Sequence, residues 1–200
     1  MQIEHLGKTP KVDPSARVAP NAVICGDVTI GANTSIGFGA VLTAETGPIQ
    51  IGKNCVIMEN TVLRGTKRHP LTIGDHVLIG PRAYLTGCTV EGCAFLATGC
   101  AIFNGATIGA RAEVRINGTV HLLTRLPPDT TVPIGWIGVG DPASVLPPDR
   151  HEEIWAIQKT LEFPKVIFGI DRPPAGETRM PDMMARYNRA LARHREDRLL

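Results

Sequence analysis

Three side chains that can bind or transfer charge recur at one position of a repeated sequence unit. Arg64, Thr86 and His121 each directly follow the Leu or Val that opens a six-residue segment. A guanidinium can hold a carboxylate or phosphate through two parallel hydrogen bonds, and an imidazole can accept a proton near neutral pH. Thr43 and Phe103 occupy the same position, so we expect the five side chains to form one outward-facing column with the spacing of neighbouring strands.

The unit that positions this column is six residues long. Twenty Val, Ile or Leu residues follow one another at this step between Val12 and Val132, with three slips. The residue four places later is small in eighteen of the twenty cases, the exceptions being Lys67 and Trp136. A six-residue period fits neither an α-helix nor an ordinary two-faced strand. It predicts a parallel β-helix whose stacked coils supply the core, with insertions near 46–50 and 65–72 looping out at corners.

The repeat fades near Trp136, and Pro- and Gly-containing stretches follow. We therefore predict a β-helix domain over residues 1–140 and a helical extension over 141–200 that packs on the solenoid. The extension is expected to contain two helices.

The first of these helices is predicted over residues 150–161, with Asp149 as its N-cap. Its apolar stripe, which includes Ile154, is expected to dock on the solenoid wall. The second helix is predicted over residues 181–198, with Pro181 in its first turn.

Composition narrows the functional classes. The formal net charge is only +2 and no Lys/Arg stripe is present, so we expect no nucleic-acid partner. No apolar stretch is long enough to cross a bilayer, and we expect a cytoplasmic protein. The five cysteines contain no CxxC pair, which argues against a disulfide framework. Cys55 and Cys100 fall at small inward positions and are predicted to be packing residues.

Four stretches of the chain resemble the gamma-class carbonic anhydrases, a family of the left-handed β-helix hexapeptide superfamily. The resemblance covers about residues 10–145. The stretches that carry it are Gly47-Pro-Ile-Gln-Ile-Gly52, His69-Pro-Leu-Thr-Ile-Gly-Asp75, Leu85-Thr-Gly-Cys88 and Phe103-Asn-Gly-Ala-Thr-Ile-Gly109. The resemblance implies a left-handed coil, a homotrimer and a C-terminal helix packed along the solenoid.

The resemblance also implies one zinc ion at each subunit interface, held by three histidines. Aligned on this chain, those positions are Arg64, Pro81 and Thr86. Arginine is cationic without a free lone pair, proline has no ligand atom and a threonine hydroxyl is a poor ligand. We therefore predict no metal and no carbonic anhydrase activity at this site.

The family's geometry would place Glu45 and Glu59 near Arg64. Our first hypothesis is a metal-free, divergent family member that binds or transforms a small anionic metabolite at the trimer interface. In it a glutamate acts as base, and Arg64 or Arg82 holds the anion, with a non-zinc, lyase-like reaction if there is one. Tyr84 and Thr86 complete this predicted site. The simpler alternative is that the ion pairs only hold the trimer together.

Two further alternatives stay open. His121 resembles the general base of hexapeptide acyltransferases, with Arg115 and Asn117 from the facing column as binding residues and acyl-CoA as co-substrate. A hydrogen-bonded surface role for His121 is the simpler reading. The third hypothesis is a non-catalytic trimeric scaffold without any cofactor.

Overall fold

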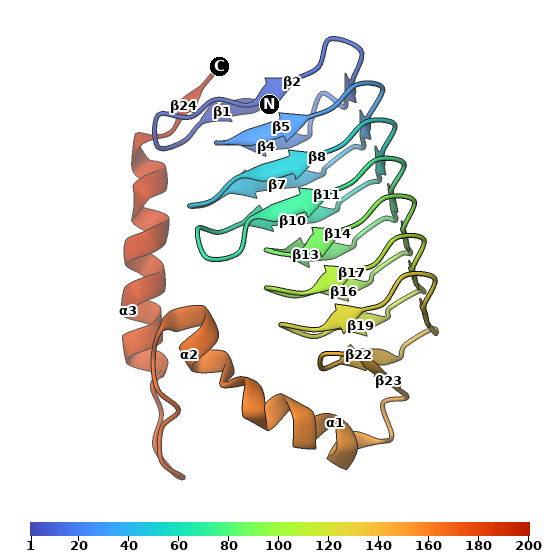
Figure 1. The fold of residues 1–200 in the computed structure, drawn as a ribbon. Helices are drawn as coiled ribbons and strands as arrows, with labels where there is room; N and C mark the ends of the chain where they lie inside the picture. Colours follow the sequence, from blue (N-terminus) through green and yellow to red (C-terminus); the bar gives the residue numbers. More distant parts are fainter.

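The computed structural model describes residues 1–200 and has the predicted architecture, a left-handed parallel β-helix followed by C-terminal helices (Figure 1). Short strands stack into three sheets that form the three faces of the solenoid.

Sheet 1 contains ten strands, and sheets 2 and 3 contain seven each. The strands of sheet 1 are β1 (Gln2–Glu4), β4 (Val23–Cys25), β7 (Val41–Ala44), β10 (Val62–Gly65), β13 (Tyr84–Thr86), β16 (Ala101–Ile102), β19 (Thr119–Val120), β22 (Ile137–Val139), β23 (Ser144–Leu146) and β24 (Arg198–Leu199). Those of sheet 2 are β2 (Lys11–Val12), β5 (Val28–Ile30), β8 (Ile49–Ile51), β11 (Leu71–Ile73), β14 (Thr89–Val90), β17 (Thr107–Ile108) and β20 (Arg125–Leu126). Those of sheet 3 are β3 (Arg17–Val18), β6 (Ser35–Ile36), β9 (Val56–Ile57), β12 (Leu78–Ile79), β15 (Phe95–Leu96), β18 (Glu113–Val114) and β21 (Thr131–Val132).

The strand register confirms the repeat and its slips. Leu42, Leu63 and Leu85 are aligned on neighbouring strands of sheet 1 although an insertion separates each from the next. Ile73 pairs with Val90 across the one-residue deletion. Each slip is therefore absorbed at a corner, and the apolar column stays in register.

The core is a single cluster of 33 buried residues, formed by the aliphatic column and the small residues behind it. Cys55 and Cys100 are fully buried within it, so the predicted packing role is confirmed. The prediction of small inward residues is wrong at Thr46 and Thr89, which are exposed. Thr46 lies before β8 and Thr89 opens β14, and each of these strands is displaced by a slip. The buried positions are Ile49 and Cys88 instead.

The corners explain which residues the repeat tolerates between strands. Asn33, Asn54, Asn60 and Asn117 all have φ near +55°. Asn adopts this left-handed region more readily than most residues because its short side chain can bond the local backbone. Arg82 stands at an equivalent corner with φ +58°.

The C-terminal extension begins with the hairpin of β22 and β23, and the predicted boundary at residue 140 falls in its turn. The helical elements that follow are α1 (His151–Gln158), the 3-10 helix η1 (Lys159–Leu161), α2 (Phe163–Phe168), α3 (Met180–Leu191) and the 3-10 helix η2 (Ala192–Glu196). None of these helices is both long and apolar enough to span a bilayer.

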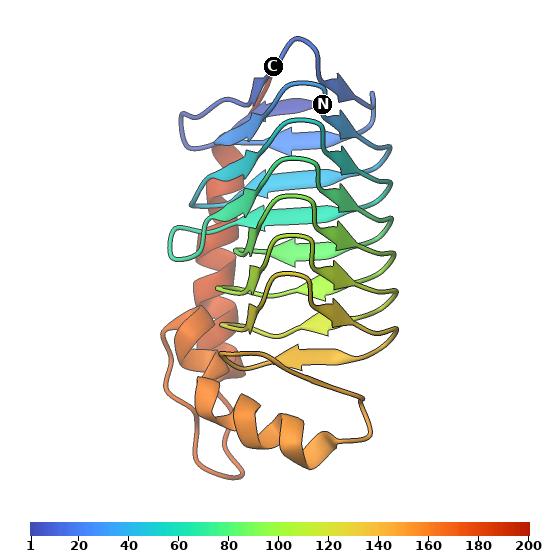
Figure 2. The same ribbon diagram turned by 45° about the vertical axis from the view of Figure 1, so that its right-hand side comes forward.

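Helix α1 covers the open end of the solenoid next to β22, rather than its wall as predicted (Figures 1 and 2). Ile154 is buried there, and Ile157 approaches Gly140. The prediction of Asp149 as N-cap is wrong, because the capping position is Arg150 and no side chain caps the helix. Pro181 does lie in the first turn of α3.

Helix α3 runs alongside the stack toward its first coil, where the chain ends as β24 (Figure 1). Strand β24 pairs antiparallel with β1, so that Ile3 faces Leu199 and Glu4 faces Arg198. This pairing returns the C-terminus to the N-terminus. Neither β24 nor α2 was predicted from the sequence.

Candidate functional site

A cleft of about 580 Å³ lies between the outward face of sheet 1 and helices α2 and α3. Its floor comes from strands β10 and β13, one side from the loop of residues 66–69, and the other side from the helices. Apolar residues make half of its lining, including Phe103, Phe163 and Phe168. It is larger than the cavity of about 210 Å³ beside His5 and is the candidate ligand site.

Two residues that were expected to replace metal ligands lie side by side on its floor. Arg64 and Thr86 are direct partners across β10 and β13. Adjacent outward residues on paired strands can reach a common ligand. Beside them, the rings of Tyr84 and Phe103 lie 6.0 Å apart.

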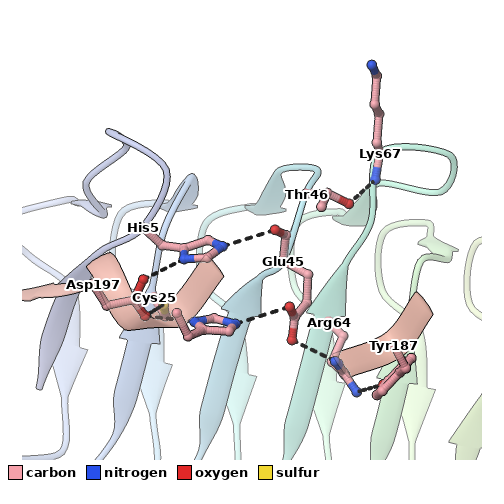
Figure 3. Close-up of polar contacts among 9 residues, drawn as sticks. His5, Cys25, Glu45, Thr46, Arg64, Lys67, Tyr187 and Asp197 are labelled. Carbon is pink, nitrogen blue, oxygen red and sulfur yellow. Dashed lines mark hydrogen bonds and ion pairs between the residues drawn. The ribbon is translucent and has the colours of Figure 1, made fainter. Parts of the chain in front are cut away.

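The Arg64 guanidinium is held by a chain of polar contacts (Figure 3). Its Nη2 donates to Glu45 Oε1 at 2.6 Å, and its Nη1 donates to the hydroxyl of Tyr187 at 2.9 Å. Burial lowers the pKa of the guanidinium, but the Glu45 carboxylate and Tyr187 more than offset this and raise it above its ordinary value. Arg64 is therefore a fixed cation at the cleft floor.

Three further cations line the cleft without a carboxylate partner. Arg68 donates from Nη1 to the carbonyl oxygen of Val166 at 3.1 Å, and Arg186 donates to that of Phe168 at 2.8 Å. Lys67 is exposed at the tip of the insertion loop. None of the three forms an ion pair, whereas Glu45 is the only acidic residue in the lining. The cleft therefore has excess positive charge.

His69 is the only imidazole in the lining. Its loop is closed by a backbone hydrogen bond from the N–H of Thr66 to the carbonyl oxygen of His69, and the ring packs over Gly105. The Nε2 atom is buried and has no hydrogen-bond partner. Burial, and secondarily the charge of Arg68, lower the pKa of this imidazole, which favours its neutral form.

The structure gathers four of the predicted site residues into this cleft, namely Glu45, Arg64, Tyr84 and Thr86. Four others, Glu59, Arg82, Arg115 and Asn117, lie outside it and are exposed. Arg115 forms an ion pair with Glu113 at 2.5 Å. Glu59, Arg82 and Asn117 belong to the corner between sheets 3 and 1, so within one chain they do not meet Arg64.

His121 lies further along the same outward column, outside the cleft. Its ring centroid is 6.3 Å from that of Phe103. The Nδ1 atom is buried without a hydrogen-bond partner, and burial lowers the pKa of the imidazole. This nitrogen therefore does not fit the simpler prediction of a hydrogen-bonded surface histidine.

Both the sequence and the fold of the chain are similar to those of known proteins. Two family models match, "Bacterial transferase hexapeptide (six repeats)" over residues 9–44 and "Hexapeptide repeat of succinyl-transferase" over residues 27–64 and 70–108. The mitochondrial Gamma carbonic anhydrase 1 of Arabidopsis thaliana is 35% identical over 159 residues, which is 76% of this chain but only 56% of that protein. The chain thus spans little more than half of this relative's length.

In two other matches, the similarity covers most of the length of the related protein. A probable carbonic anhydrase of Methanocaldococcus jannaschii is 33% identical over 148 residues, which is 74% of this chain and 89% of that protein. The crystal structure of a Bacillus cereus protein, provisionally described as an acetyltransferase, superposes with a TM-score of 0.61 at 28% identity. That match covers 76% of this chain and 87% of the other.

Proposed function

We propose, from the premise that this chain belongs to the gamma carbonic anhydrase family of hexapeptide-repeat proteins, that it is a divergent member which binds a small organic anion. The ligand occupies the cleft between sheet 1 and helices α2 and α3. It carries a carboxylate or phosphate group on an apolar body.

The observation that carries this proposal is the pairing of unneutralised cations with an apolar wall. Lys67, Arg68 and Arg186 supply positive charge that no carboxylate of the chain offsets. Aromatic and aliphatic side chains from α2 and α3 line the same cleft. A charged group without a partner is costly to desolvate, so an anion whose body covers the apolar wall satisfies both sides.

The residues at the family's zinc positions do not fit that metal. Arg64 is a cation already bonded to Glu45 and Tyr187, and Thr86 offers only a hydroxyl. Zinc sites take neutral imidazoles, thiolates or carboxylates, and a fixed guanidinium repels a dication. We therefore propose no zinc-dependent CO₂ hydration at this position.

His69 is the group that we assign to proton transfer with a bound ligand. Its buried Nε2 has no partner within the chain, so turning this nitrogen toward a ligand in the cleft would break no hydrogen bond. The environment of the ring favours the neutral form, which can accept a proton. Glu45 is less suited to this role, because its carboxylate is already bonded to Arg64 and His194. In this scheme Glu45 holds Arg64 in place.

The family resemblance adds a homotrimer to the proposal, with the ligand near the subunit interface. Sheet 3 and its corner toward sheet 1 expose large apolar side chains that a second copy would cover, namely Phe38, Val56, Leu78, Ile116 and Ile134. In the family's arrangement a neighbour's corner, which carries Glu59 and Arg82, approaches sheet 1. Those predicted residues would then contact the ligand from the adjacent subunit.

Ligand-induced stabilisation tests the binding proposal. Hexanoate, benzoate and phenyl phosphate combine an anion with an apolar body, whereas bicarbonate and hexanol each lack one of the two features. At ten times Kd, binding adds about 1.4 kcal/mol of stability, which raises Tm by roughly 3–6 °C in a chain of this length. We expect this rise for at least one of the first three probes and none for bicarbonate or hexanol.

Variants locate the ligand. Arg186→Gln should reduce the rise in Tm, and Arg17→Gln, an exposed charge on β3 far from the cleft, should not. A reduction by Arg82→Gln as well would place the ligand between subunits. If no anion stabilises the protein, the scaffold hypothesis replaces this one.

A second candidate, acyl transfer from acyl-CoA with His121 as general base, is favoured by two observations. The Nδ1 atom of His121 is buried without a partner, and the Bacillus cereus protein shares the fold at 28% identity. Acetyl-CoA should then raise Tm, and it should still do so in the Arg186→Gln variant. If acetyl-CoA leaves Tm unchanged, this candidate is withdrawn.

A further inference from the structure

Four residues of metal-binding type meet at the first coil, well away from the family's zinc positions. His5 follows β1, Cys25 ends β4, His194 lies in η2 and Asp197 precedes β24. The antiparallel pairing of β24 with β1 brings the last two residues onto the first two. One ligand atom from each of the four residues lies within 4.8 Å of every other (Figure 3).

The two imidazoles converge on one carboxylate. His5 Nδ1 is 2.6 Å from Asp197 Oδ1, and His194 Nδ1 is 2.7 Å from Asp197 Oδ2. The Cys25 thiol points to the same carboxylate, with Sγ 3.7 Å from Oδ2. The two rings are stacked, with centroids 4.2 Å apart.

The opposite nitrogens of both rings are held by a single residue. His5 Nε2 lies 3.1 Å from the backbone oxygen of Glu45, and His194 Nε2 lies 3.1 Å from Glu45 Oε2. Hydrogen bonds of this kind fix the tautomer and orientation of metal-bound histidines. Glu45 therefore has the position of an outer-shell partner.

With both rings neutral, this arrangement leaves a donor conflict that either a further proton on each ring or a metal cation resolves. A neutral imidazole has one N–H and one lone pair. If each Nε2–H donates to Glu45, the Nδ1 lone pairs of His5 and His194 point at the carboxylate oxygens of Asp197, which also carry only lone pairs. A cation between these atoms is attracted by all of them.

We propose that His5, Cys25, His194 and Asp197 bind one Zn²⁺ ion. The set comprises two imidazole nitrogens, one thiolate sulfur and one carboxylate oxygen, which zinc accepts in a four-coordinate site. The two negative ligands balance the charge of the ion. Bond lengths of about 2.0–2.3 Å put the ligand atoms of such a site roughly 3.3–3.8 Å apart. To admit the ion, the two imidazole–carboxylate contacts of 2.6 and 2.7 Å have to widen, and any pair farther apart has to approach.

Four protein ligands leave no open position, so the site is structural rather than catalytic. His5 and Cys25 are buried, with 2% and 3% of their surface exposed. The ion would fasten the end of the chain to the first coil and thereby hold α3 over the cleft.

Zinc stoichiometry and cobalt spectroscopy on the untagged, full-length protein test this site. We expect one tightly bound zinc per chain after dialysis. Replacement of zinc by Co²⁺ should give the thiolate-to-metal charge-transfer band and the strong visible bands of a tetrahedral site. One equivalent of bound metal without the thiolate-to-Co²⁺ band would contradict the proposal. This measurement requires no variant.

Variants identify the ligands. Cys25→Ser and His194→Gln should each weaken zinc binding at least about 100-fold, the upper end of the losses caused by outer-shell changes, and Glu45→Gln should weaken it about 10- to 100-fold. Cys100→Ser and His69→Gln are the matched controls and should leave zinc binding unchanged. Unaltered affinity in Cys25→Ser would falsify the site. The His69→Gln control keeps this result independent of the anion-binding proposal.

Discussion

At the scale of single residues, Glu45 connects two regions of the molecule. Its carboxylate bonds Arg64 in the cleft through one oxygen and His194 of the C-terminal segment through the other. Its backbone oxygen accepts from the ring of His5. One side chain on the solenoid thus fixes both the cleft floor and the returning end of the chain.

The Arg64–Glu45 ion pair should contribute measurably to stability. The two side chains are 25% and 15% exposed, so removing the guanidinium leaves a mostly buried carboxylate with a single partner. After allowance for the remaining solvent screening, we expect Arg64→Met to lower the free energy of unfolding by about 1–2 kcal/mol. Urea denaturation measures this. The exposed pair Arg111–Asp129, also 2.6 Å long, provides the control, and Arg111→Met should change stability little.

Glycine is required at position 105 by both the backbone conformation and the surrounding side chains. Its φ is +73°, and an added Cβ would lie 2.6 Å from Leu123 Cδ2 and 3.2 Å from His69 Cε1. Gly135 has nearly the same φ, +70°, but nothing within 4 Å. Alanine at either position incurs a backbone cost of about 1–2 kcal/mol.

Steric crowding of the added Cβ should make the two alanine variants differ in stability. We expect Gly105→Ala to be less stable than Gly135→Ala by about 1–3 kcal/mol, because only the former overpacks its site. Gly105→Ala should also displace the His69 ring and reduce the rise in Tm caused by bound anions. Equal stability of the two variants would show that His69 and Leu123 move aside freely.

At the scale of elements, the solenoid was predictable and the helices were only partly so. The six-residue period is a local property of the chain, and it specified the strands, the outward column and the corner insertions. The positions of α2 and α3 depend on the left-handed turn at Glu162, with φ +46°, and on side-chain packing that no short pattern encodes. Consequently the floor residue Arg64 was found from sequence, whereas the wall residues Phe168, Arg186 and Tyr187 were missed.

One site residue, His69, had a partial sequence signal, whereas Cys25 and His194 had none. His69 lies in an insertion that the sequence predicted to loop out, but only the structure shows its ring against the glycine-lined coil. Cys25 and His194 are far apart in sequence, and no repeat links them. Their meeting depends on the pairing of β24 with β1, which two short terminal segments do not reveal.

Helix α1 should stabilise the solenoid by covering its last coil. Ile154 is 5% exposed, whereas its neighbour Trp155 is 43% exposed. We expect Ile154→Ala to lower the free energy of unfolding by about 2–4 kcal/mol, and Trp155→Ala by no more than about 1 kcal/mol. Thermal and chemical denaturation test the difference. The reverse order would mean that α1 packs on its opposite face.

At the scale of the whole molecule, the apolar residues of sheet 3 make self-association testable. Leu78 and Val56 are 37% and 41% exposed on this flat surface. A glutamate there would have to be desolvated in an interface between copies. We expect Leu78→Glu to convert a trimer into monomers in light scattering at micromolar concentration. Thr89→Glu, at an exposed position of sheet 2, should leave the assembly intact.

The proximity of the two chain ends has a consequence for engineering. The backbone N–H of Leu200 donates to the carbonyl of Gln2 at 3.0 Å, and both views show the termini at one end of the stack (Figures 1 and 2). A short glycine–serine bridge could therefore join residue 200 to residue 1, and the exposed segment 173–178 could supply new ends. In such a circular permutant α3 would be synthesised before the solenoid, directly linked to the coil on which it rests.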